Sequence, residues 1–289
     1  MKDMSELSYI LDISVIQDKN CLFLHQKHYI EAILQRYGMD KANPIATPAD
    51  TNMKLKKNDG VSKPVDPCTY QSMVGSLLYA AMATRPDIAQ AVSVVSKFNA
   101  SPNAAHLTAV KRILCYLKGT LNLTLAQYER SDSGTLVGFS DADWGGDQDD
   151  RRSTTGNVFL LGGGAVSWLS KKQATVALST AEAEYVALSQ AAQECTWLTR
   201  LLSVLGMDAT PVVILEDNQG AIAIGKNPVD HSRTKHIDIR YHYIRECVQK
   251  GQIQLQYCPT DDMKADILTK PLAKQKFEYL RREIGLCNV

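Results

Sequence analysis

The order of apolar segments in the C-terminal half constrains the fold more than any other feature of the sequence. Strand patterns and one long helical pattern follow one another along the chain, at 136–140, 157–161, 166–169, the helix 180–205, then 211–215 and 253–258. The run at 211–215 is wholly apolar, which is typical of a strand buried on both faces. Strands, a long helix and then alternating strands and helices predict an α/β layer with a mixed sheet.

The N-terminal half has a different pattern, and we expect it to be mostly helical. We predict two strands within 8–25, an extended connector at 40–67 and a final strand at 121–128. The predicted helices are 27–38, 71–84, 86–98 and 104–117. A length of 289 residues suggests roughly two domains. The polar turn Arg130–Gly134 is the best boundary, which gives domains at 1–133 and 134–270 and a tail helix at 271–289.

Charge and composition exclude several classes of protein. Lys and Arg number 32 and Asp and Glu 31, so the formal net charge is +1, which argues against binding of nucleic acid by bulk positive charge. The sequence has no run of about 18 apolar residues and does not begin like a signal peptide, so we expect a cytoplasmic protein without a membrane span. The seven cysteines are scattered, which favours reduced thiols over a disulfide framework or a zinc site.

Four acidic residues border the predicted strands and the long helix. Asp141 and Asp217 each follow an apolar run, Glu182 lies in the first turn of the helix, and Asp266 follows the last strand. Carboxylates at the carboxyl ends of strands lie where α/β sheets bind ligands. Mg²⁺ and Mn²⁺ prefer such oxygen ligands, and two such ions can activate water for phosphodiester hydrolysis. The sequence therefore suggests a metal site, although spacing alone does not establish that the acids converge.

Two of these acids have a simpler structural explanation. Ser179 and Glu182 form the pattern of a helix capping box, and this role is as well supported as metal binding and compatible with it. Asp217 has the position of a helix N-cap, which is the commoner role for an aspartate there.

Ordered sequence blocks across nearly the whole chain closely resemble copia-type LTR retrotransposon Pol polyproteins. In the C-terminal half they resemble the ribonuclease H region, and the blocks are Ser140–Asp147, Arg152–Gly156, Ser167–Gln173, Ala177–Tyr185, Asp217–Gln219, Arg233–His242 and Ala265–Pro271. In the N-terminal half they resemble the end of the reverse transcriptase and its connection, and the blocks are Tyr29–Leu34, Pro44–Pro48, Tyr70–Tyr79 and Ala83–Ala89.

This resemblance implies a ribonuclease H-like fold with a mixed five-stranded sheet, preceded by a mostly helical reverse transcriptase thumb or connection segment. It implies Mg²⁺-dependent hydrolysis of the RNA strand of RNA–DNA hybrids, with two ions for which Mn²⁺ can substitute. The four family acids correspond to Asp141, Glu182, Asp217 and Asp266, as catalytic residues and as metal ligands. Glu184 is the rival to Glu182, two residues along the same helix.

The segment 226–250 is locally basic in a nearly neutral chain. It holds six Lys or Arg residues against three acids. The resemblance favours a clamp on the hybrid backbone formed by Arg233, Lys235, His236 and Arg240. The alternative is a solvated amphipathic helix with an apolar side at residues such as Ile237 and Ile244.

The reverse transcriptase motif Tyr-x-Asp-Asp does not occur in the chain, so we expect no polymerase activity from it alone. A second hypothesis is a non-catalytic remnant of a truncated Pol that only binds nucleic acid or has a structural role. A phosphatase that uses Asp141 and Asp143 is a weaker third one. The expected partners are the RNA–DNA hybrid and the remaining Pol polyprotein, within a virus-like particle for an active element; dimerisation is compatible with this hypothesis.

Overall fold

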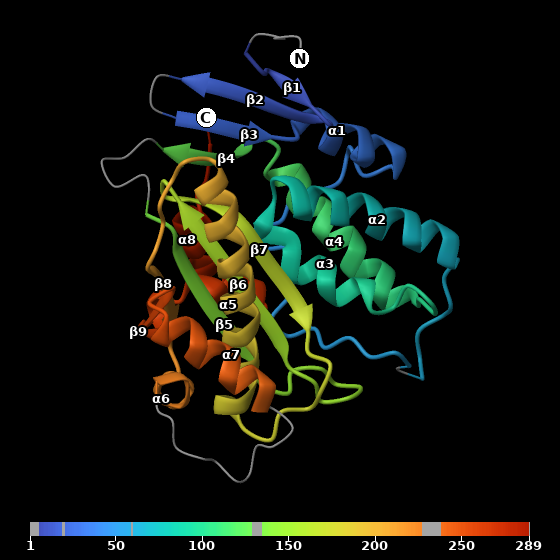
Figure 1. The fold of residues 1–289 in the computed structure, drawn as a ribbon. Helices are drawn as coiled ribbons and strands as arrows, with labels where there is room; N and C mark the ends of the chain where they lie inside the picture. Colours follow the sequence, from blue (N-terminus) through green and yellow to red (C-terminus); the bar gives the residue numbers. More distant parts are fainter. Residues whose placement is uncertain (1–5, 19–20, 59, 129–134, 227–237, 289) are drawn as a thin grey trace. The chain divides into compact units, whose positions relative to one another are not determined.

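The structure is a computed structural model that describes residues 6–288, apart from 19–20, 59, 129–134 and 227–237 (Figure 1). It consists of two units. Unit 1 combines Met1–Arg130 with Pro271–Val289, and unit 2 is Ser131–Lys270. The sequence boundary predicted near 130–134 falls at residues that the structure does not describe, and the predicted tail 271–289 groups with the N-terminal residues.

The strands of unit 1 form an antiparallel sheet in the order β1-β2-β3-β4-β10. Their bounds are β1 Tyr9–Ile10, β2 Ile13–Asp18, β3 Cys21–His25, β4 Leu123–Tyr128 and β10 Leu286–Asn288. The strands expected within 8–25 and 121–128 are therefore present. Strand β10, which lies in the segment expected to be a tail helix, adds to β4 at the edge of the sheet.

The helices of unit 1 account for the mostly helical character predicted for the N-terminal half. They are α1 Lys27–Arg36, α2 Pro67–Ala83, the short 3₁₀ helix η1 Pro86–Ile88, α3 Ala89–Ser96, α4 Ala104–Gly119 and α8 Lys274–Glu283. Helix α2 begins four residues before the predicted start because Asp66 caps it, accepting hydrogen bonds from the backbone N–H groups of Cys68 and Thr69. Pro67 occupies the first helical position, where no N–H is needed.

A buried ion pair lies in a hydrogen-bond network that joins η1, α4 and α8 of unit 1. Arg85 Nη2 lies 2.7 Å from Asp87 Oδ2, and both side chains are almost fully buried. The Tyr116 hydroxyl of α4 donates to the same Asp87 oxygen at 2.5 Å. Arg281 of α8 donates in turn to the Tyr116 oxygen at 3.1 Å. The network therefore connects α8 to η1 and α4 through polar groups within an apolar core.

Unit 2 is built around a mixed five-stranded sheet in the order β7-β6-β5-β8-β9 (Figure 1). The strands are β5 Val137–Asp143, β6 Thr154–Leu161, β7 Gly164–Lys172, β8 Val212–Glu216 and β9 Ile253–Tyr257. Strands β5, β6 and β7 pair antiparallel, whereas β8 pairs parallel with both β5 and β9. The α/β fold with a mixed five-stranded sheet predicted from the sequence is confirmed.

The helices of unit 2 follow the predicted order. They are α5 Thr180–Val204, α6 Gln219–Lys226, α7 Asp238–Gln249 and the short 3₁₀ helices η3 Thr260–Asp262 and η4 Lys264–Leu268. Helix α5 packs along the sheet (Figure 1), where Tyr185 and Leu188 share a buried core with Val212 and Ile214 of β8. No helix among the described residues combines the length and the hydropathy needed to cross a membrane.

Candidate metal centre

The register of the central strands brings two of the predicted aspartates together. Strands β5 and β8 run parallel, and Ser140 of β5 pairs with Glu216 of β8. Asp141 follows Ser140, and Asp217 follows Glu216, so the two aspartates are neighbours where the pairing ends. Asp217 directly follows its strand as the sequence predicted, whereas Asp141 lies inside β5, two residues before its end.

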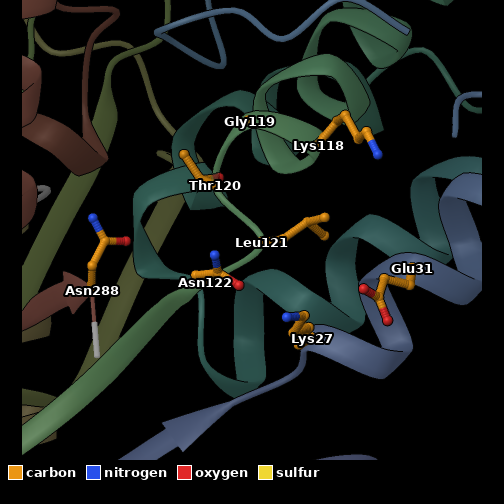
Figure 2. A pocket seen from close by; sticks show the side chains of 8 residues that line it. All are labelled: Lys27, Glu31, Lys118, Gly119, Thr120, Leu121, Asn122 and Asn288. Carbon is orange, nitrogen blue, oxygen red and sulfur yellow. The ribbon is translucent and has the colours of Figure 1, made fainter. Parts of the chain in front are cut away.

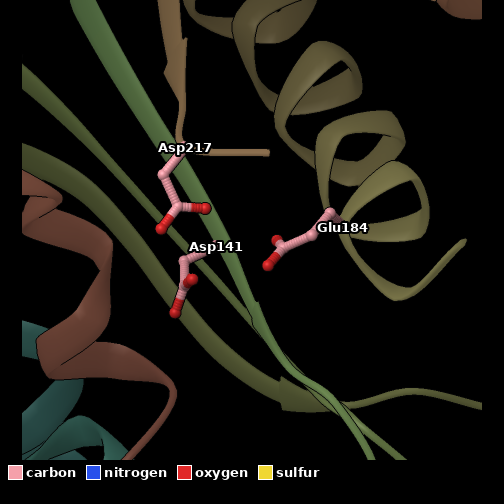
Figure 3. Close-up of side chains that lie close together, drawn as sticks. All are labelled: Asp141, Glu184 and Asp217. Carbon is pink, nitrogen blue, oxygen red and sulfur yellow. The ribbon is translucent and has the colours of Figure 1, made fainter. Parts of the chain in front are cut away.

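Three carboxylates form the candidate metal centre. One oxygen atom from each of Asp141, Glu184 and Asp217 lies within 4.8 Å of the other two. Figure 3 shows Asp141 and Asp217 beside the central strand, with the Glu184 side chain reaching toward them from helix α5. Asp141 is 2% exposed and Glu184 is 7% exposed, whereas Asp217 is partly exposed, so the centre is buried on two sides and reaches solvent on the Asp217 side.

The helix carboxylate that lies in this cluster belongs to Glu184, the rival named for the predicted Glu182, which is not in the cluster. Glu182 Oε2 accepts a hydrogen bond from the backbone N–H of Leu178 at 2.8 Å, and its own N–H donates to Ser179 Oγ at 3.2 Å. The second of these is the bond to the N-cap side chain that a capping box contains, whereas the first joins Glu182 to Leu178, the residue before the N-cap. Residues two apart on a helix point to different sides, so the capping glutamate and the cluster glutamate are different residues.

A further glutamate that sequence analysis did not single out lies next to the centre. Glu216 is fully buried at the end of β8, and its inward direction follows the alternation that also buries Val212 and Ile214. Because the run 211–215 is wholly apolar, the sequence shows no alternation that marks this face, and the pattern alone does not distinguish Glu216. One Glu216 oxygen accepts from the backbone N–H of Asn218 at 3.2 Å.

Burial and mutual repulsion raise the pKa values of three acids in this region, Asp141, Glu184 and Glu216. Burial raises the pKa of Asp141 to about 7, with Asp266 adding to the rise and Lys270 opposing it. Burial also raises the pKa of Glu184 to about 11, and Glu216 is the next cause. The pKa of Glu216 itself is well above its usual value, again mainly because of burial. The protein alone therefore supplies too little positive charge to keep all these carboxylates ionised.

The donor set fits a divalent cation. All the converging atoms are carboxylate oxygens, the ligands that Mg²⁺ and Mn²⁺ prefer. The Oε2 atoms of Glu184 and Glu216 are buried without a hydrogen-bond partner among the described residues. Buried carboxylate oxygens without a donor are costly unless a cation compensates them. A bound cation would also favour the ionised form of the surrounding acids.

Asp266, the fourth predicted acid, reaches the centre through a lysine. It is fully buried in η4, and its Oδ1 lies 2.6 Å from the Lys270 ammonium. The same ammonium lies 3.9 Å from Asp141 Oδ2. The Thr269 hydroxyl donates a hydrogen bond to that Asp141 oxygen. Sequence analysis did not select Thr269 or Lys270, because their contacts depend on how the turn after η4 folds.

Gly156 allows η4 to approach the sheet. It pairs with Asp141 across β5 and β6, and a Cβ at this position would lie 2.6 Å from Thr269 Cγ2 and 3.0 Å from Leu268 Cβ. We expect Gly156→Ala to destabilise unit 2 by roughly 1–3 kcal/mol, because the added methyl group pushes η4 away. Urea unfolding followed by tryptophan fluorescence measures this.

The matched substitution Gly75→Ala is a control for the glycine change itself. Gly75 lies inside α2 with no atom within 4 Å of the added methyl group. We expect it to stabilise its helix by about 0.5–1 kcal/mol. Unchanged stability of unit 2 in Gly156→Ala would mean that η4 accommodates the methyl group freely.

The four residues predicted to contact nucleic acid fall where the structure gives no side-chain positions. Arg233, Lys235 and His236 lie outside the described residues, and the side chain of Arg240 in α7 does too. The basic clamp therefore stays a prediction.

A separate cavity of about 480 Å³ lies in unit 1. Figure 2 shows the residues that line it, which are Lys27, Glu31, Lys118, Gly119, Thr120, Leu121, Asn122 and Asn288. It holds a single carboxylate, Glu31, whose Oε2 lies 3.6 Å from His28 Nδ1. Its lining lacks the several converging carboxylates that a Mg²⁺ site needs, so the cavity is no alternative metal centre.

Comparison with known proteins identifies relatives along the whole chain. The chain is 42% identical over 299 residues to the retrovirus-related Pol polyprotein from transposon TNT 1-94 of Nicotiana tabacum, which covers 99% of this chain and 22% of that protein. It is 43% identical over 290 residues to that from transposon RE1 of Arabidopsis thaliana, covering 100% of this chain and 20% of the relative. It is also 39% identical over 197 residues to an uncharacterized mitochondrial protein of Arabidopsis thaliana, AtMg00810, of which it covers 80%. The chain thus spans about a fifth of the length of the Pol polyproteins it matches.

Solved structures with a related arrangement share little sequence with the chain. LC11-RNase H1 is 14% identical with a TM-score of 0.38, and the match covers 47% of this chain and 93% of that one. The foamy viral protease-reverse transcriptase in complex with double-stranded DNA is 11% identical with a TM-score of 0.47, over 86% of this chain and 38% of that one. No protein-family model matches the chain.

Proposed function

Because the chain belongs to the copia-type retrotransposon Pol polyproteins and unit 2 has a ribonuclease H-like fold, we propose that unit 2 is their ribonuclease H. It hydrolyses the RNA strand of RNA–DNA hybrids and depends on Mg²⁺, for which Mn²⁺ can substitute. The chain acts in the cytoplasm, within a virus-like particle when the element is active, together with the rest of Pol. In this assignment residues 134–270 are the nuclease domain and 1–133 the reverse transcriptase connection.

The observation that carries this proposal is the convergence of Asp141 of β5, Asp217 directly after the parallel strand β8, and Glu184 of helix α5. Three converging carboxylates, two of them buried, suit a divalent metal ion. When bound there, two such ions would activate the attacking water and stabilise the leaving oxygen of the phosphodiester.

The chain's own residues have distinct roles in this proposal. Asp141, Glu184 and Asp217 hold metal, and Asp266 contributes from the Asp141 side. The Thr269 hydroxyl fixes one Asp141 oxygen by donating to it, which fixes the carboxylate orientation. Glu182 makes hydrogen bonds to Leu178 and Ser179 at the start of α5, which stabilise the first turn of the helix that carries Glu184. Arg233, Lys235, His236 and Arg240 bind phosphates of the hybrid.

Cleavage of a defined hybrid by the full chain tests this proposal. The chain, expressed in a host strain that lacks its own ribonuclease H, is incubated with a duplex labelled separately in its RNA and DNA strands. We expect Mg²⁺ to produce RNA fragments, EDTA to stop their formation, and the DNA strand to stay intact. A labelled RNA duplex is the substrate control and should resist cleavage.

The competing function is a non-catalytic, nucleic-acid-binding or structural remnant of a truncated Pol. Absence of RNA cleavage with both Mg²⁺ and Mn²⁺, by a chain with cooperative unfolding, would favour the remnant and rule out the nuclease. Retention of all four acids identified by the resemblance favours the enzyme, since random decay would be expected to remove one of them.

A further inference from the structure

Lys270 places a positive charge between two acids of the candidate metal centre. Its ammonium lies 2.6 Å from Asp266 Oδ1 and 3.9 Å from Asp141 Oδ2. The two carboxylates are almost completely buried, whereas the Lys270 side chain is 39% exposed. The lysine therefore reaches from the surface to the space between two buried acids.

This ammonium and a divalent ion compete for the same oxygens. An ion that used Asp141 and Asp266 together would occupy the space next to the ammonium, and two cations in contact repel strongly where water is scarce. Among the described residues, the ion pairs of Lys270 involve Asp141 and Asp266 but not Glu184 or Asp217. The centre is therefore asymmetric, with a built-in cation on the Asp266 side.

We propose that Lys270 is an internal counter-ion that makes the Asp266 side of the centre the weaker metal site. The cluster of Asp141, Glu184 and Asp217 binds a first ion while Lys270 stays in place. A second ion binds beside Asp266 only after the ammonium leaves these carboxylates. The partial exposure of Lys270 gives its long side chain a path into water. This inference rests on the proposed function only in assuming that the centre binds divalent metal.

Metal binding without nucleic acid tests the inference. Free Mn²⁺ is titrated against the full chain and measured by electron paramagnetic resonance. In the unmodified chain we expect one tighter and one weaker site. Lys270→Met should tighten the weaker site roughly tenfold or more, because the competing charge is gone. Lys270→Arg should keep it weak, which separates charge from side-chain volume.

Two controls keep the result interpretable. Lys171→Met removes an exposed lysine of the same unit and should leave both affinities unchanged. In the unmodified chain, the side-chain ammonium signal of Lys270 in ¹⁵N NMR should persist through the first equivalent of Mg²⁺ and change at the second. This second measurement still tests the inference if Lys270→Met does not fold.

Equal affinities of the weaker site in Lys270→Met and the unmodified chain would overturn the inference, as would an ammonium signal that changes with the first equivalent. Failure of the proposed function has a different signature. A chain that shows the expected Mn²⁺ pattern but never cleaves RNA refutes the nuclease and leaves the role of Lys270 intact.

Discussion

Glu184→Gln is expected to reduce cleavage of the RNA strand by roughly 10²-fold or more, whereas Glu182→Gln keeps activity close to that of the unmodified chain. Loss of a hydrogen-bond partner behind a metal ligand costs about 10–100-fold, and loss of a ligand itself should cost no less. The prediction follows from geometry, because Glu184 converges with Asp141 and Asp217 while Glu182 caps α5.

The two glutamine variants are matched in chemistry and lie in the same helix. Glutamine also carries a side-chain oxygen that can accept from the Leu178 N–H, so Glu182→Gln should fold normally. Asp141→Asn is the reference for complete loss of cleavage, since Asp141 converges with Glu184 and Asp217 and also lies next to Lys270. Initial rates on the labelled hybrid at saturating Mg²⁺ measure all three variants. Comparable loss in Glu182→Gln and full activity in Glu184→Gln would return the assignment to Glu182.

Arg85→Met is expected to have the largest effect on stability, about 3–5 kcal/mol, because it leaves the Asp87 carboxylate buried without its cation. Burial by itself raises the pKa of Asp87, but the Arg85 guanidinium outweighs this and holds the pKa below its usual value. The guanidinium also donates to the Thr120 hydroxyl at 2.7 Å and to the Thr120 carbonyl at 3.2 Å. All these bonds are lost together.

The positions of the tryptophans allow this loss to be assigned to one unit. The three tryptophans of the chain, Trp144, Trp168 and Trp197, all lie in unit 2. Urea unfolding followed by circular dichroism should therefore show an earlier transition in Arg85→Met, while the tryptophan transition moves far less.

Two further variants control for the charge. Arg112→Met removes a partly exposed arginine that lies 3.5 Å from Asp50 in the same unit, and it should cost about 0–1 kcal/mol. Arg85→Met combined with Asp87→Leu removes both buried charges and should recover much of the lost stability. A cost for Arg85→Met no greater than that for Arg112→Met would mean that the buried pair contributes little.

The parts of the centre that follow from strand order could be predicted from the sequence. Asp141 and Asp217 each follow an apolar run in the sequence, and the parallel pairing of β5 and β8 makes them neighbours. Glu184 could be named only as a rival, because the resemblance assigned the helix acid to Glu182 and the rotation of the helix relative to the sheet is set by packing. The contacts of Lys270 depend on the conformation of a single turn, which the hydrophobic periodicity of the sequence does not predict.

Strand β10 illustrates the same limit in unit 1. It has three residues, Leu286–Asn288, too few for an alternating pattern to be recognised. Its partner, β4, is more than 150 residues earlier in the chain, with Leu286 opposite Leu125. A contact of that separation depends on the whole intervening chain, and local preference says nothing about it.

The return of the chain to unit 1 has a consequence for synthesis. Unit 2 is contained in one continuous segment that ends at Lys270, whereas unit 1 needs α8 and β10 from the far end. On the ribosome, the later segment can therefore mature first. The earlier segment must wait, with an edge of β4 and the polar partners of Arg281 uncovered, until α8 and β10 emerge. The order of folding is then the reverse of the order of translation.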